Sequence, residues 1–163
     1  NIQRIKGVGG SERYFVNTLP LLRARGLGVE IALVHRPSEA AAAAPVINAL
    51  RAAGVPVHIV QDPKALSLGI LRKLHRIIQA GKYDIVHTHL IHADLYGALL
   101  RLAFRLRQPL VSTKHGYEER YVERNGLQRI NRRWAPYLAA ARFAERFISR
   151  SPARAGSGPA LWL

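Results

Sequence analysis

The 163-residue sequence contains no cysteine and no methionine, and acidic residues are scarce. Without cysteine, neither a disulfide framework nor a thiolate metal site can form. Without methionine there is no initiator residue, so we expect residue 1 to lie inside a longer protein. No apolar run approaches the roughly 18 residues that a membrane-spanning helix needs, and residues 1–6 are too polar for a signal-peptide core. These absences predict a cytoplasmic domain.

The scarcity of acidic residues gives the chain a formal charge of +15, from 25 Lys and Arg against 10 Asp and Glu. With 48% hydrophobic and 21% charged residues, the composition is nevertheless that of one globular domain. The basic surplus indicates a solvated helix face, a surface for anionic lipid, or nucleic-acid binding. Nucleic acid is the less favoured partner, because no nucleic-acid motif is present and the aromatics are not interleaved with the basic residues.

Short β-type runs alternate with segments of helical periodicity. The runs are rich in Val and Ile and cover residues 28–35, 55–60, 84–89, 109–114 and 146–149. Between them, apolar stripes recur at every third or fourth position: Phe15, Leu19 and Leu22; Leu71, Leu74 and Ile78; Leu95, Leu99, Leu102 and Leu106; and Leu127, Ile130, Trp134 and Leu138. This alternation predicts an α/β fold, namely a Rossmann-like doubly wound parallel sheet with helices on both faces.

Glycine and proline refine the helix boundaries. A shorter helix is expected over residues 46–53. Two prolines, Pro20 and Pro136, lie inside predicted helices and predict a kink or an early end. Three glycines are expected to cap helix C-termini: Gly26, Gly54 and Gly81.

The two ends of the sequence differ from the rest. Residues 1–5 fit the last part of a first strand, and residues 151–163, rich in Ser, Pro and Gly, fit a linker. We therefore expect a domain over residues 1–150 with a truncated first strand. Because that strand is central in this fold, its loss would leave unpaired backbone groups and predicts marginal stability.

A glycine-rich segment, residues 7–12 (GVGGSE), precedes the first helix. Glycine lets the backbone turn tightly and approach a ligand, and a helix N-terminus favours phosphate. The segment is not the full dinucleotide fingerprint, because Glu12 stands where a third glycine is required. A phosphate-binding loop and an ordinary turn capped by Ser11 are both open interpretations.

Histidines cluster where two consecutive strands end. His87 and His89 are two residues apart, so they point to the same face of their strand. His115 ends the next strand and should face the same crevice, because open α/β sheets bind ligands at the carboxyl ends of their strands. We expect His87 to be a core residue satisfied by a backbone hydrogen bond. The other three, His89, His92 and His115, are expected to line a polar crevice that contacts hydroxyls or phosphate.

A metal site is the rival explanation for these histidines, since imidazole is the commonest metal ligand. The His-x-His-x-Asp-His hydrolase pattern fails, because Ile91 stands where Asp is required. The His-x-His pair of barrel hydrolases needs a (β/α)₈ barrel, for which the chain is too short. We therefore expect no metal at this site.

Four motifs carry a family resemblance. They are residues 9–12 with the following leucine-rich helix, residues 83–89 with Tyr96 and Gly97, residues 112–116, and residues 146–151. In this order and spacing they resemble the N-terminal domain of family 4 glycosyltransferases, which have the GT-B fold. The resemblance runs from about Ile5 to Ser151, nearly the whole chain.

The resemblance implies transfer of a sugar from a nucleotide-sugar donor to an acceptor, usually with retention, between two Rossmann-like domains. It implies no cofactor beyond the donor substrate. Gly9 and Gly10 would contact the donor diphosphate, and His115, the candidate catalytic residue, would contact the donor sugar. Glu12, His89 and His92 would lie on the acceptor side.

The glutamate pair of the family's C-terminal domain is missing; Glu118, for example, is followed eight positions later by Gly126. We therefore expect this half to be inactive alone. The acceptor would be a sugar, or a lipid-linked or cell-envelope glycan. A lipid-linked acceptor would place this cytoplasmic enzyme at the inner face of a membrane. The alternative is a non-enzymatic basic α/β module that binds nucleic acid or anionic membrane.

Overall fold

The computed structural model describes residues 1–113 and 115. These residues form a five-stranded, all-parallel sheet in the order β3-β2-β1-β4-β5. A short 3₁₀ helix (Pro37–Glu39) precedes α2, and the other elements are β1 (Ile2–Arg4), α1 (Gly10–Ala24), β2 (Ile31–His35), α2 (Ala40–Ala52), β3 (Val57–Gln61), α3 (Leu68–Gly81), β4 (Val86–His89), α4 (Leu90–Phe104) and β5 (Leu110–Thr113). The Rossmann-like sheet is confirmed, and every strand predicted before residue 114 overlaps an observed one.

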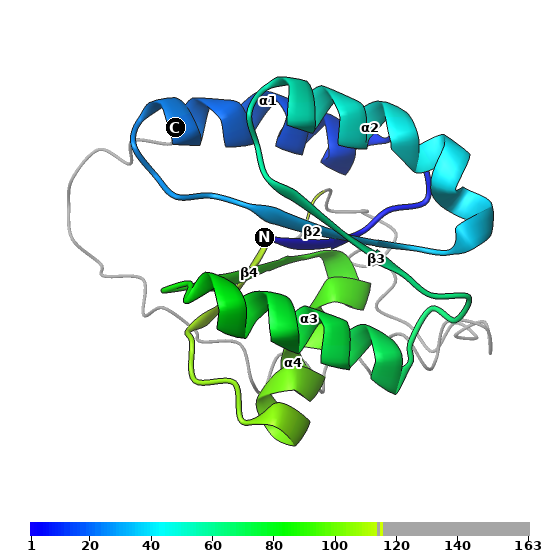
Figure 1. The fold of residues 1–163 in the computed structure, drawn as a ribbon, viewed down its shortest axis with the longest axis vertical. Coiled ribbons are helices and arrows are strands. Elements are labelled where there is room, and N and C mark those ends of the chain that lie inside the picture. Colours follow the sequence, from blue (N-terminus) through cyan, green and yellow to red (C-terminus); the bar gives the residue numbers. More distant parts are fainter. Residues whose placement is uncertain (114, 116–163) are drawn as a thin grey trace, which may run out of the picture.

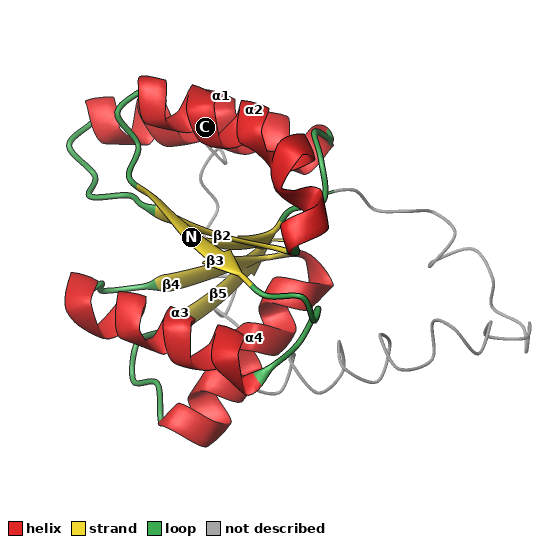
Figure 2. Cartoon of the chain, turned by 45° about the vertical axis from the view of Figure 1, so that its right-hand side comes forward, coloured by secondary structure: helices red, strands yellow, loops and turns green. Residues whose placement is uncertain are grey.

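The sheet is covered on both faces, by α1 and α2 on one side and by α3 and α4 on the other (Figures 1 and 2). All five residues of β2 are buried, as the continuous apolar run of a doubly covered parallel strand requires. Ile31 and Leu33 pack with α1 and α2, whereas Ala32 and Val34 pack with α3 and α4. Because successive side chains of β2 point to opposite faces of the sheet, this one strand contributes to the hydrophobic core on each side.

The first strand lies at the centre of the sheet, as predicted. It pairs with β2 through Ile2 and Ala32, and with β4 through Gln3 and His89. The predicted strand at 146–149, the helix that contains Pro136 and the linker at 151–163 lie outside the described residues.

Helix boundaries match the predictions only in part. Gly26 and Gly54 have φ of 82° and 74° and end their helices as expected. Gly81 does not, because it is the last residue of α3 and Lys82 takes the left-handed conformation instead. Pro20 does not end α1, which continues to Ala24.

The second helix is longer than the predicted range 46–53. It begins at Ala40 and includes Pro45. Alanine is the strongest helix former, so the alanine-rich stretch before this proline is helical rather than irregular.

The predicted buried stripe of α4 is wrong. Leu102 is 58% exposed, and Leu106 is buried but lies beyond the end of the helix. The buried face instead contains the small residues Ala93 and Gly97, together with Tyr96 and Leu100. Small side chains let the helix backbone approach the sheet closely. The face of α4 that carries the small residues is therefore the buried one, rather than the face that carries most of the leucines.

Gly97 marks the closest approach of α4 to the sheet. A Cβ at this position would lie 2.8 Å from Leu110 Cδ1 and 3.1 Å from Thr88 Cγ2, and both neighbours are fully buried. We predict that Gly97→Ala destabilises the fold, because overpacking costs about 1–3 kcal/mol and the gain in helix propensity is only about 1 kcal/mol. Urea unfolding measures the difference.

Gly10→Ala is the matched control, since a Cβ there meets no atom within 4 Å. It should leave the unfolding midpoint unchanged or slightly raised. A midpoint for Gly97→Ala equal to that of the control would contradict the close approach of α4.

Candidate functional site

The order of the strands defines one special edge of the sheet. From β1 the chain builds β2 and β3 on one side, and then crosses to build β4 and β5 on the other. The carboxyl ends of β1 and β4 therefore lie side by side at the topological switch point, where open α/β sheets bind ligands. The glycine-rich segment follows β1, and α4 follows β4 without any loop. At this junction Leu90 has φ of 66°, an uncommon conformation for a side chain of its size.

The glycine-rich segment ends at the N-terminus of α1, and Glu12 occupies that terminus. Gly9 donates its backbone N–H to Glu12 Oε2 over 3.0 Å, and Ser11 Oγ donates to the same oxygen over 3.0 Å. Ser11 is therefore not the cap that the sequence suggested. A carboxylate near the start of a helix is stabilised by the helix dipole, and Glu12 is buried, at 7% exposed.

Three of the four histidines come together, as their spacing predicted. His89 Nδ1 lies 2.9 Å from His115 Nε2, and the rings are stacked. The rings of His87 and His89 have centroids 4.1 Å apart. His87 Nε2 pairs with Thr113 Oγ1 at 2.8 Å, so its partner is a side chain rather than the predicted backbone group.

Within this cluster, the His89 side chain is almost completely buried. It is 1% exposed, with the Phe15 ring edge-on to it at 4.6 Å and Asn1 Oδ1 3.0 Å from its Nε2. His115 is half-buried, and the ring of Tyr14, 38% exposed, lies 4.7 Å from it. The accessible part of the cluster is thus formed by His115, Tyr14 and the half-buried His87, whereas His89 lies behind them.

Burial makes these imidazoles poor bases. Desolvation lowers the pKa of His89 to about 2 and that of His87 to about 4. It also lowers the pKa of His115. A neutral imidazole offers one donor and one acceptor, which suits the hydroxyls of a sugar better than the charge of a phosphate.

His92 does not join this cluster. Burial, followed by the positive charges of Lys6, Arg4 and Arg36, lowers its pKa to about 4. Arg4 is itself buried, and its Nη2 lies 3.0 Å from both carboxylate oxygens of Glu39. The switch point therefore has two parts, one aromatic with neutral imidazoles and the other basic.

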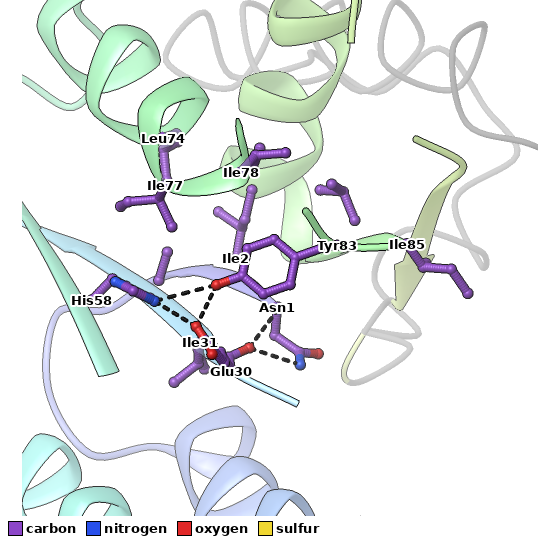
Figure 3. A pocket seen from close by; sticks show the side chains of 12 residues that line it. Asn1, Ile2, Glu30, Ile31, His58, Leu74, Ile77, Ile78, Tyr83 and Ile85 are labelled. Carbon is purple, nitrogen blue, oxygen red and sulfur yellow. Dashed lines mark hydrogen bonds and ion pairs between the residues drawn. The ribbon is translucent and has the colours of Figure 1, made fainter. Parts of the chain in front are cut away.

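The described part of the chain holds no group of three or more His, Cys, Asp or Glu side chains that could bind a metal ion. A cavity does exist at the opposite edge of the sheet, lined in part by Glu30, His58 and Tyr83 (Figure 3). Its volume of about 30 Å³ admits water but not a sugar. The switch point is therefore the better candidate for a substrate site.

One known protein family covers most of this chain. The model of Glycosyltransferase Family 4 matches residues 8–155. This chain belongs to glycosyltransferase family 4. Searches of curated proteins and of solved structures returned no match. Across residues 1–113, no helix of this glycosyltransferase is long and apolar enough to cross a membrane.

Sequence reasoning missed Tyr14, Phe15 and Asn1 in the candidate site of this glycosyltransferase. Phe15 was assigned only to a core stripe, yet its ring also packs against His89. An aromatic pair one turn after a glycine-rich segment was the available signal for Tyr14. Nothing in the sequence pointed to Asn1, whose contact with His89 joins residues 88 positions apart.

The low pKa of His89 predicts acid sensitivity of the glycosyltransferase. The unfolded chain binds a proton on this imidazole below its ordinary pKa of 6.5, whereas the folded chain resists protonation down to about pH 2. Stability should therefore fall as the pH drops below 6.5, and His89 should contribute a slope of about 1.4 kcal/mol per pH unit. His89→Phe should flatten the dependence of the unfolding free energy on pH between 6 and 5. Parallel pH profiles for wild type and variant would contradict the neutral, buried state of His89.

Proposed function

We propose that this chain is the acceptor-side domain, residues 1–150, of a two-domain enzyme. The enzyme would transfer a hexosyl group from a nucleotide sugar to a sugar or lipid-linked acceptor, with retention of configuration. The observation that supports this best is the pairing of His115 with the exposed ring of Tyr14 at the switch point of a family 4 fold. Aromatic faces and neutral hydrogen-bonding groups are what a sugar needs for recognition.

The chemistry requires stabilisation of the leaving diphosphate. Breaking the bond between sugar and phosphate builds negative charge, which preorganised N–H groups can stabilise. We assign this part to the exposed start of α1, where Gly10 would offer its N–H. The N–H of Gly9 is bonded to Glu12, so Gly9 would contribute by letting the diphosphate approach the backbone closely. Gly10 has open space where a side chain would stand, so a ligand can approach its backbone closely.

Glu12 fits the acceptor side of the proposed site. Its carboxylate already accepts the Gly9 N–H, and a diphosphate at that N–H would meet the negative charge. An acceptor hydroxyl, by contrast, can donate a hydrogen bond to a carboxylate. We place the acceptor between Glu12 and the basic part of the edge near His92, with His89 supporting the site from behind.

His115 is the proposed catalytic residue. As a neutral imidazole beside Tyr14, it can accept a hydrogen bond from a hydroxyl of the donor sugar and hold the sugar against the glycine-rich segment. The proposal requires neither a metal nor a cofactor. The half that would supply the nucleotide-binding residues is a second domain, so we propose that the chain is inactive alone.

The charge of +15 supports a location at the inner, cytoplasmic face of a membrane. Each basic side chain near an anionic surface contributes about 1 kcal/mol of attraction. Co-sedimentation with anionic vesicles at low salt, lost at high salt, is the expected result, and absence of binding at low salt would remove this part of the proposal.

Turnover tests the function. In the two-domain enzyme, we predict hydrolysis or transfer with at least one nucleotide sugar, and a loss of about 10²-fold for His115→Ala, the range seen when one preorganised hydrogen-bonding group is removed. A coupled assay for the released nucleotide measures both.

His75→Ala is the control. This imidazole is on α3 and contacts Phe104 at the far end of α4, so its removal should leave turnover unchanged. No turnover with any nucleotide sugar would contradict the proposed function and favour a basic binding module instead. Equal activity of His115→Ala and wild type would contradict the site assignment alone.

A further inference from the structure

We propose that His89 is a positioning residue for His115. A chain of hydrogen bonds that starts at a backbone carbonyl fixes the proton of His89, and through it the proton of His115. As a result, Nδ1 of His115 carries no proton and is a hydrogen-bond acceptor. The use of this acceptor by a sugar hydroxyl rests on the proposed function, whereas the hydrogen-bond chain itself does not.

The first step fixes the side-chain amide of Asn1. Its Nδ2 lies 3.2 Å from the backbone oxygen of Glu30 (Figure 3). A carbonyl oxygen can only accept, so the atom that faces it must be the amide nitrogen. The amide oxygen of Asn1 therefore points to the other partner, Nε2 of His89, at 3.0 Å.

The second step fixes the proton of His89. Because the Asn1 oxygen can only accept, Nε2 of His89 must donate. A neutral imidazole has a single N–H, so Nδ1 of His89 has no proton and must accept. Its partner at 2.9 Å is Nε2 of His115.

The third step follows for His115. Its Nε2 must donate to His89, so the N–H of a neutral ring is used there. The remaining nitrogen, Nδ1, is left as an acceptor. If the amide of Asn1 were reversed, every bond in the chain would reverse and His115 Nδ1 would be a donor instead.

The surroundings hold His89 in this orientation. Its ring is 1% exposed and packs against two other rings. The centroid of the Phe15 ring, which is edge-on, lies 4.6 Å from the centroid of His89, and that of His87 lies 4.1 Å from it. A flip of the ring would place carbon atoms against Asn1 and His115 and break both hydrogen bonds. Two bonded nitrogens in a packed ring are the arrangement that fixes a tautomer.

Glu30, at the start of this series of hydrogen bonds, is held in place as well. The Glu30 side chain accepts hydrogen bonds from Tyr83 Oη and, at 2.7 Å, pairs with Nε2 of His58 (Figure 3). These contacts join the starts of β2, β3 and β4 at the edge opposite the site. These side-chain contacts hold Glu30 in place beside the small cavity, and its backbone oxygen is where the hydrogen-bond chain to His89 starts.

Nitrogen-15 NMR of the 163-residue chain tests the proposal without any activity. The expected result is a coupling across the hydrogen bond between His89 Nδ1 and His115 Nε2, with the proton of each ring on Nε2. In Asn1→Ala the oxygen that fixes His89 is gone, so a second tautomer should appear in both rings. In His89→Phe the coupling should be lost, and His115 should populate both tautomers.

His75→Phe is the control for replacing an imidazole by a phenyl ring, and it should leave the His115 signals unchanged. A proton on Nδ1 of His89 or of His115 in the wild type would overturn the proposal. So would an absent coupling, or His115 signals that are the same in wild type, Asn1→Ala and His89→Phe. None of these results depends on glycosyl transfer, so a failure of the proposed function remains distinguishable.

Discussion

The structure depends on the pairing of β1 with β4. Gln3 on β1 is in register with His89 on β4, although the two residues are far apart in sequence. This pairing sets the glycine-rich segment beside the histidine cluster, and it does so only because the strand order reverses there. A site that needs N–H groups from one segment and imidazoles from another therefore follows from the topology of the sheet.

Buried polar groups add a second constraint. Arg4, Glu12 and His89 are each at most 7% exposed. Arg4 pairs with Glu39 and His89 with Asn1, both from distant segments, whereas Glu12 accepts from Gly9 at the cap of its own helix. Since an unpaired buried polar group costs about 1–3 kcal/mol, these pairs restrict how the loops at the switch point can lie. The same bonds that satisfy these buried groups thereby orient the candidate site.

The sequence predicted the sheet and the convergence of His87, His89 and His115 at one edge, because period-two alternation and strand ends are local signals. It failed for α4, where close approach at Gly97 buried small residues instead of the leucine stripe. It also failed for the cap of α1 and for Asn1, since a bond across 88 positions leaves no local pattern.

The central claim is that the switch point between β1 and β4 is the substrate site of this glycosyltransferase. The most direct measurement is a titration of nucleoside diphosphate sugars into the two-domain enzyme, followed through the backbone and imidazole chemical shifts of residues 1–163. The account predicts that Gly9, Gly10 and His115 shift first. Shifts confined to His58 and Tyr83 at the opposite edge, or no shift with any donor, would contradict it.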